Sequence, residues 1–118
     1  MLNRLLRAGT GTGATAPETD VVQTVRARAA GTTQIVDVRE PDEWAAGHIP
    51  GALNIPLGDL GRRKSELDAA RPVITVCRSG RRSLIAAEEL LTGGFTDAAS
   101  LAGGMVAWEN AKQPVEAS

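Results

Sequence analysis

Cys77 is the only cysteine of this 118-residue chain, and it stands where a thiol can do chemistry. In the stretch VITVCRSGRRS, residues 73–83, four β-favouring residues precede it and three arginines occupy the next five positions. A cysteine reacts as the thiolate, and positive charge, backbone N–H groups and a helix N-terminus all favour that form. The sequence therefore predicts a nucleophilic sulfur in a loop that also binds an anionic substrate.

The elements around Cys77 determine where this loop must lie. VITV predicts a buried strand that ends at Cys77, and a helix is expected to begin near Ser83. In an open α/β sheet, ligands bind at the carboxyl ends of the strands, where loop N–H groups can converge on an anion. Gly80 supplies the backbone freedom that such a turn needs. We therefore expect the loop to open at the ligand-binding edge of a sheet.

The loop residues after Cys77 form the expected substrate-binding set. They are Arg78, Ser79, Gly80, Arg81, Arg82 and Ser83. The sequence leaves open which of the three arginines faces the site. It also leaves open whether Ser83 donates to a bound anion or caps the following helix. The alternative, a buried structural cysteine beside a solvated row of arginines, does not account for the strand end, glycine turn and helix start that coincide here.

Composition restricts the classes of function. The hydrophobic fraction of 42% predicts one packed domain, and the net charge of -1 gives no overall signature of a nucleic-acid or membrane-surface binder. One cysteine and one histidine make a zinc site improbable and exclude an intramolecular disulfide, so we expect no metal and no cofactor. A lone thiol, no signal-peptide pattern and no long apolar run predict a cytoplasmic protein without a membrane span.

Strands and helices alternate along the chain. We expect strands within residues 32–38, 52–56, 71–76 and 95–104, and helices over 16–31, 41–47, 83–94 and 104–114. In the first helix, Pro17 suits the first helical position. This alternation predicts an α/β fold with a central, mostly parallel sheet of about five short strands and helices on both faces.

The first residues differ in composition from the rest. Residues 1–16 end in a Gly/Thr/Ala tract that predicts an N-terminal extension or flexible linker. GTGATA, residues 11–16, also fits a loose G-x-G-x-x-A dinucleotide pattern, but no β-like segment precedes it, so we favour the linker. The domain is expected to span residues 17–115, with 116–118 as a C-terminal tail.

Three segments resemble the rhodanese-like domain family of sulfurtransferases. C-R-S-G-R-R, residues 77–82, resembles the family's six-residue active-site loop. IVDVREPDEWAAGHIPGALNIP (35–56) and FTDAASLAGGMVAW (95–108) resemble its first and closing signatures, in the expected order. The resemblance implies a single rhodanese-like domain. In it, Cys77 takes sulfur from a small anionic donor (thiosulfate or a persulfide) and passes it to cyanide, a thiol or a partner protein.

The resemblance also implies roles for residues outside the loop. Asp37 and Arg39 follow a buried strand and are expected to support the active loop through polar contacts. His48 is expected to stabilise its turn rather than to form a dyad with Cys77. Trp44 and Trp108 are expected in the core or in helix packing.

Three other functions compete with sulfur transfer by an enzyme. A cysteine phosphatase or arsenate reductase loop has five residues between Cys and Arg, whereas only four separate Cys77 from Arg82. Another alternative is a non-catalytic or regulatory rhodanese-like binding module, although this chain keeps its cysteine. A protein persulfide carrier lies between the sulfurtransferase enzyme and the non-catalytic module, with weak thiosulfate activity and a stable sulfur adduct on Cys77.

Overall fold

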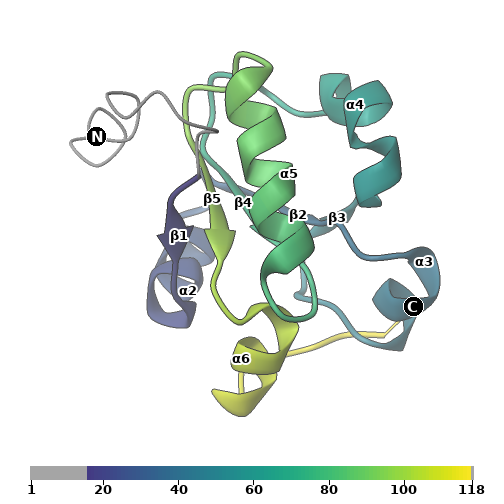
Figure 1. Ribbon diagram of the computed structural model, residues 1–118. Coiled ribbons are helices and arrows are strands. Elements are labelled where there is room, and N and C mark those ends of the chain that lie inside the picture. Colours follow the sequence, from purple (N-terminus) through teal and green to yellow (C-terminus); the bar gives the residue numbers. More distant parts are fainter. Residues whose placement is uncertain (1–15, 118) are drawn as a thin grey trace.

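A five-stranded parallel sheet forms the centre of the computed structural model, which describes residues 16–117 (Figure 1). The strands run in the order β1-β5-β4-β2-β3, and every neighbouring pair is parallel. Their bounds are β1 Glu18–Thr19, β2 Gln34–Asp37, β3 Leu53–Asn54, β4 Val73–Val76 and β5 Ala98–Leu101. β4 is buried along its whole length, as expected for a central strand.

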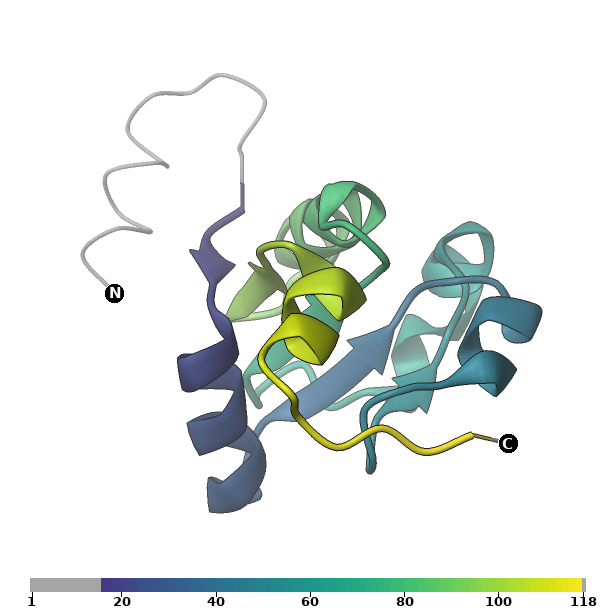
Figure 2. The same cartoon turned by 90° about the horizontal axis from the view of Figure 1, so that it is seen from below.

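Helices cover both faces of this sheet. They are α2 Val21–Ala30, α3 Pro41–Ala46, α4 Leu60–Arg63, α5 Arg81–Thr92 and α6 Gly104–Asn110, with 3-10 turns η1 Leu57–Asp59 and η2 Lys64–Glu66. Two apolar clusters fill the space between the layers. One lies under α4 and α5 and includes Leu60, Cys77 and Leu90. The other lies under α2 and α6 and includes Ile74 and Trp108. Helices α2 and α5 lie on opposite sides of the sheet (Figure 2). The predicted α/β class is confirmed.

The first helix begins later than expected. Glu18 and Thr19 pair with β5 instead of forming the first helical turn, and Asp20 caps α2 by accepting a hydrogen bond from the Gln23 N–H at 2.8 Å. The prediction that Pro17 opens the helix was wrong. The carbonyl of Pro17 accepts a hydrogen bond from Ser100, so pairing with the sheet overrides the local helical preference.

Both ends of the described chain join the fold. Ala16, which we assigned to the extension, is 3% exposed and lies in the core. Glu116, which we assigned to the tail, forms an antiparallel bridge with His48. The G-x-G-x-x-A segment lies outside the described residues, except for Ala16.

The parallel strands bring the chemistry-bearing residues to one edge. Asp37 of β2 and Val76 of β4 are register partners, so residues 37–39 and the loop after Val76 leave the sheet side by side. Helices α3, α5 and α6 all follow from this edge (Figure 1). Among residues 16–117, no helix has the length and apolar character needed to cross a membrane.

Candidate active site

Cys77 lies at the first position after β4, and its side chain is almost completely enclosed. It is 1% exposed. The backbone N–H of Gly80 donates a hydrogen bond to its Sγ at 3.1 Å, and the Ser83 Oγ lies 3.4 Å from the same sulfur. Ser83 is itself buried and lies 2.7 Å from the Ser100 hydroxyl. The loop therefore folds around the sulfur and presents hydrogen-bond donors to it.

These contacts favour the thiolate. Burial by itself raises the pKa of the Cys77 thiol. Hydrogen bonds from the Ser83 hydroxyl and from the backbone N–H groups of residues 79, 80 and 83 lower the pKa, and together they outweigh burial. The net pKa is below the ordinary value of a cysteine. The sequence predicted this lowering from loop N–H groups, a helix N-terminus and arginine charge together, and hydrogen bonds from the loop are the largest lowering causes in the structure.

The alkylation rate of Cys77 is expected to titrate with a midpoint below the value of about 8.5 for a free thiol. Ser83→Ala removes one donor to the thiolate and is expected to raise that midpoint. Iodoacetamide kinetics across a pH series measure it. Ser65→Ala, at an exposed serine of η2, is the matched control and should leave the midpoint unchanged. A wild-type midpoint at or above that of a free thiol would contradict the loop geometry.

Ser83 does not cap α5. The helix begins at Arg81, and Gly80 occupies the N-cap position with a left-handed φ of 106°. The expected helix start near Ser83 was therefore two residues late. Because α5 begins earlier, Ser83 lies in its first turn and points into the protein toward Cys77.

The loop is held in place by the first turn of α6. The backbone N–H groups of Met105 and Val106 donate to the carbonyls of Cys77 and Arg78, at 2.8 and 3.1 Å. Gly104 has a φ of 52°, and a Cβ there would overlap these same carbonyl groups. The second glycine of the LAGG segment therefore allows α6 to approach the loop, a function that sequence reasoning did not identify.

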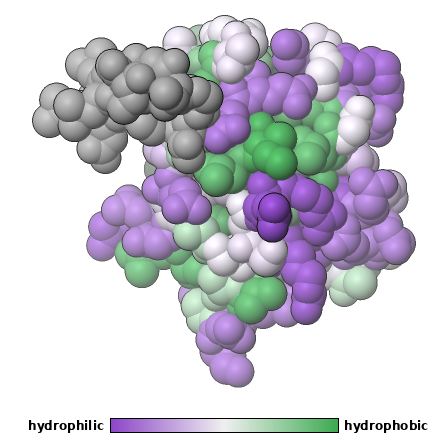
Figure 3. All heavy atoms as spheres, in the orientation of Figure 1, coloured by the Kyte–Doolittle hydropathy of each residue, from purple (hydrophilic) through white to green (hydrophobic). Residues whose placement is uncertain are grey.

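The three arginines of the loop have different environments. Arg82 donates two hydrogen bonds to the Glu43 carboxylate, at 2.8 and 3.0 Å, and so joins α5 to α3. Arg78 and Arg81 are exposed, and neither has an ion-pair partner within residues 16–117. In the space-filling view, hydrophilic residues cover the start of α5, between apolar surface over α5 and α6 (Figure 3). Two arginines are therefore free to attract an anion.

Glu43 was not among the predicted site residues. It is separated from Arg82 by 39 positions, so no local spacing indicated the pair. The hydrogen bonds from Arg82 lower the pKa of Glu43 to about 2, against the raising effect of burial. The carboxylate is therefore ionised throughout the neutral range, and it offsets the charge of Arg82.

Replacing Glu43 by glutamine is expected to lower the free energy of unfolding by about 1 kcal/mol near neutral pH, a small value because the pair is partly exposed and screened. The pKa of Glu43 is lower in the folded protein than its ordinary 4.5, so the pair stabilises the fold above that pH. The contribution is lost as pH falls toward about 2. Urea titrations across this range measure it, with Glu18→Gln as a control at an exposed glutamate that has no ion pair within residues 16–117. A stability difference that does not shrink in acid would contradict this assignment.

Asp37 and Arg39 form a buried ion pair with an N–O distance of 2.7 Å. Arg39 also donates to the carbonyl of Gly47, and so it holds the segment that contains α3 against β2. Within residues 16–117, no hydrogen bond joins either side chain to residues 77–83. The pair therefore contacts the neighbouring wall, and it acts on the active loop through charge. In addition to the hydrogen bonds between Glu43 and Arg82, the charge of Asp37 raises the pKa of Arg82, and that of Arg39 lowers the pKa of Glu43.

His48 is bound into its own turn. Its Nδ1 lies 2.9 Å from the carbonyl oxygen of Trp44, and its ring stacks on that of Trp44 with centroids 3.5 Å apart. Its Nε2 lies 3.6 Å from the Glu116 carboxylate. In the described chain no hydrogen bond links His48 to Cys77, so the geometry gives no support to a dyad. Trp108 is fully buried in the core, as expected.

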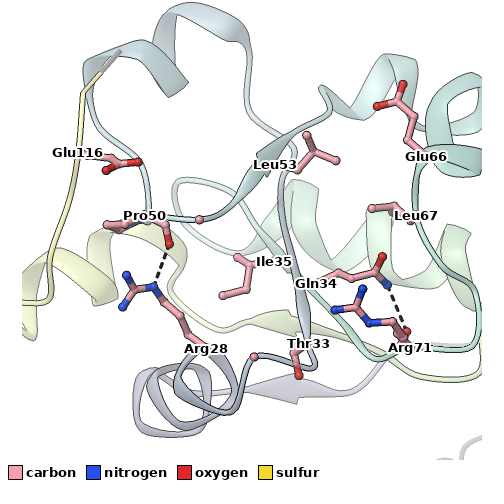
Figure 4. A pocket seen from close by; sticks show the side chains of 12 residues that line it. Arg28, Thr33, Gln34, Ile35, Pro50, Leu53, Glu66, Leu67, Arg71 and Glu116 are labelled. Carbon is pink, nitrogen blue, oxygen red and sulfur yellow. Dashed lines mark hydrogen bonds between the residues drawn. The ribbon is translucent and has the colours of Figure 1, made fainter.

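The described surface has cavities, of which two bear on the location of the site. One of about 250 Å³ lies beside the active loop, lined by Arg39, Glu43, Ala46, Gly47, Arg78 and Glu109. A larger one of about 710 Å³ contains none of the predicted site residues. Its walls include Gln34, Leu53 and Arg71, and Arg28 donates to the carbonyl of Pro50 across it (Figure 4). The smaller cavity is the one that adjoins the candidate chemistry.

The family model for the rhodanese-like domain matches residues 21–111. Thiosulfate sulfurtransferase GlpE of Shewanella oneidensis is 40% identical over 91 residues, which cover 77% of this chain and 90% of that protein. Uncharacterized protein YqhL of Bacillus subtilis is 45% identical over 75 residues, which cover 64% of this chain and 60% of that protein. The crystal structure of a rhodanese-related protein from Thermoplasma volcanium is similar, with a TM-score of 0.79 at 25% identity, and the match covers 86% of this chain and 99% of that one.

Some curated relatives are longer than this chain. The chain spans 60% of YqhL, and 40% and 51% of two further relatives, from Bacillus subtilis and Raphanus sativus.

Proposed function

This chain belongs to the rhodanese-like domain family, and we propose that it is a sulfurtransferase that carries sulfur as a persulfide on Cys77. One observation carries the proposal: the Cys77 sulfur is enclosed by a loop whose N–H and O–H groups point at it and lower its pKa. Similarity to proteins named sulfurtransferases, such as GlpE of Shewanella oneidensis, supports it.

The first half-reaction follows from this geometry. The Cys77 thiolate attacks the outer sulfur of thiosulfate, a new S–S bond forms at Sγ, and the S–S bond of thiosulfate breaks. Sulfite leaves with the electron pair of that bond. Exposed Arg78 and Arg81 attract the dianionic donor toward the loop. The N–H of Gly80, which already donates to the sulfur, is placed to stabilise charge on the persulfide.

The second half-reaction regenerates the thiolate. A nucleophilic acceptor, which is cyanide, a thiol or a partner protein, attacks the outer sulfur of the Cys77 persulfide. The bond between the two sulfurs breaks, and its electron pair returns to Sγ. A catalytic thiol that must stay free of oxidation suits a reducing compartment such as the cytoplasm, which we propose as its location.

The competing functions fit the site less well. A phosphate-binding loop needs an arginine that points at the anion, whereas Arg82 is bound by Glu43. A purely non-catalytic module does not require a thiol whose pKa is lowered by its surrounding loop. A persulfide carrier uses the same first half-reaction, and it differs in weak turnover of thiosulfate and in a stable sulfur adduct that only a partner protein removes.

Incubating the protein with thiosulfate and cyanide tests the proposal. We expect catalytic formation of thiocyanate, measured as its iron complex. If neither thiosulfate nor a persulfide donor yields thiocyanate, the sulfurtransferase proposal is rejected. Hydrolysis of p-nitrophenyl phosphate that depends on Cys77 would favour the phosphatase instead.

A further inference from the structure

The small cavity beside the active loop has a charge pattern that suggests what it binds. It lies between residues 39–47, which include α3, the residue after Cys77, and α6. Its charged lining residues are Arg39, Glu43, Arg78 and Glu109. We propose that this cavity is the acceptor subsite, and that it takes a small amino-acid thiol of the kind represented by free cysteine, bound through its carboxylate and ammonium groups. This inference rests on the proposed sulfurtransferase function.

Arg39 provides the first argument. Its side chain is 6% exposed, and its Nε and Nη2 donate to Asp37 and Gly47. Within the described residues its Nη1 has no hydrogen-bond partner, although the side chain lines the cavity. A buried donor without a partner is costly, so an acceptor in the cavity would satisfy it. A carboxylate has the geometry and charge to bind such a guanidinium.

Arg78 and Glu109 provide the rest of the pattern. Both line the cavity, and in the part of the chain that the structure describes neither side chain forms an ion pair. Glu43 also lines the cavity, but its charge is offset by Arg82. The uncompensated groups are therefore Arg78, which adds to the carboxylate site, and Glu109, which suits an ammonium group. An α-amino acid carries both of these charges.

The size of the cavity restricts the ligand further. Its volume of about 250 Å³ is below the range of about 300–1,000 Å³ typical of drug-sized ligands. It suits a molecule the size of a single amino acid, so a larger peptide thiol would extend beyond it.

The chemical step balances without an added oxidant or reductant. The cysteine thiolate attacks the outer sulfur of the Cys77 persulfide, and a bond forms between that sulfur and the cysteine sulfur. The bond from Sγ to the outer sulfur breaks, and its electron pair leaves Cys77 as a thiolate. The product is cysteine persulfide, and the proton of the incoming thiol goes to solvent.

The experiment compares acceptors that each lack one charged group. The protein is loaded with sulfur from thiosulfate, excess donor is removed, and sulfur release is timed with cysteine, 3-mercaptopropionate, cysteamine and cyanide. 3-Mercaptopropionate lacks the ammonium group, and cysteamine lacks the carboxylate. Each rate is divided by the fraction of the acceptor thiol that is ionised. We then expect kcat/KM for cysteine to exceed that of each truncated thiol by about fivefold, because a single charge contact at an exposed site contributes about 1 kcal/mol at most.

A variant then locates the ammonium contact. Glu109→Gln is expected to remove the advantage of cysteine over 3-mercaptopropionate and to keep its advantage over cysteamine. Glu18→Gln, at an exposed glutamate on β1, is the matched control and should keep both preferences. Equal use of the three thiols, or an unchanged preference in Glu109→Gln, would overturn the inference while cyanide still accepts sulfur. If cyanide accepts none, the proposed function itself fails, and the inference fails with it.

Discussion

Cys77→Ser is expected to abolish thiocyanate formation from thiosulfate and cyanide, with a loss of more than about 10³-fold. A serine hydroxyl is not ionised near neutral pH and forms no persulfide, so both half-reactions stop. The variant is expected to fold, because serine is close to cysteine in size and the Gly80 N–H and Ser83 Oγ that surround Sγ can hydrogen-bond a hydroxyl.

The comparison needs a measure of folding. Circular dichroism and thermal unfolding of Cys77→Ser should match those of the wild type within a few degrees of Tm. A folded variant that keeps thiocyanate formation would show that sulfur travels by another route. Loss of activity together with loss of the fold would not count as support, and Cys77→Ala would then serve as a second, smaller replacement.

Gly104→Ala is expected to have the second largest effect. The new Cβ would overlap the carbonyl groups of Cys77 and Arg78, and the backbone at Gly104 is left-handed, with a φ of 52°. We expect the free energy of unfolding to fall by about 2–3 kcal/mol and the transferase activity to fall by about tenfold or more, because the loop must move away from α6.

Gly31→Ala is the control variant, because it introduces backbone strain without displacing the Cys77 loop. Gly31 also has a left-handed φ, of 78°, but a Cβ there meets nothing within 4 Å. It should cost about 1–2 kcal/mol of stability and leave kcat unchanged. Chemical denaturation and steady-state kinetics of both variants supply the comparison. If Gly104→Ala keeps full activity, the first turn of α6 does not position the Cys77 loop.

The parts of the fold that depend on local pattern could be predicted from the sequence. β4 is a run of β-favouring residues that ends at Cys77, and the alternation of strands and helices leaves few arrangements other than a parallel sheet with two covered faces. The thiol therefore had to lie at the ligand-binding edge. This placement needed no knowledge of contacts between distant residues.

The parts that depend on distant partners could not be predicted. β1 is only two residues long, and it forms because its backbone pairs with β5. The local sequence of β1 favoured a helix, and this pairing with a distant strand could not be predicted from it. Arg82 appeared equivalent to Arg78 and Arg81 until the fold brought Glu43 to it. The support of the loop by Met105 and Val106 likewise depends on close approach of α6, which only the geometry at Gly104 reveals.

The most direct test of the central claim is the intact mass of the protein after incubation with thiosulfate and removal of excess donor. We predict that the protein gains the mass of one sulfur atom, that peptide mapping places it on Cys77, and that cyanide removes it with release of thiocyanate. A protein that gains no sulfur from thiosulfate or from a persulfide donor, while its Cys77 remains reduced and reactive, would contradict the claim.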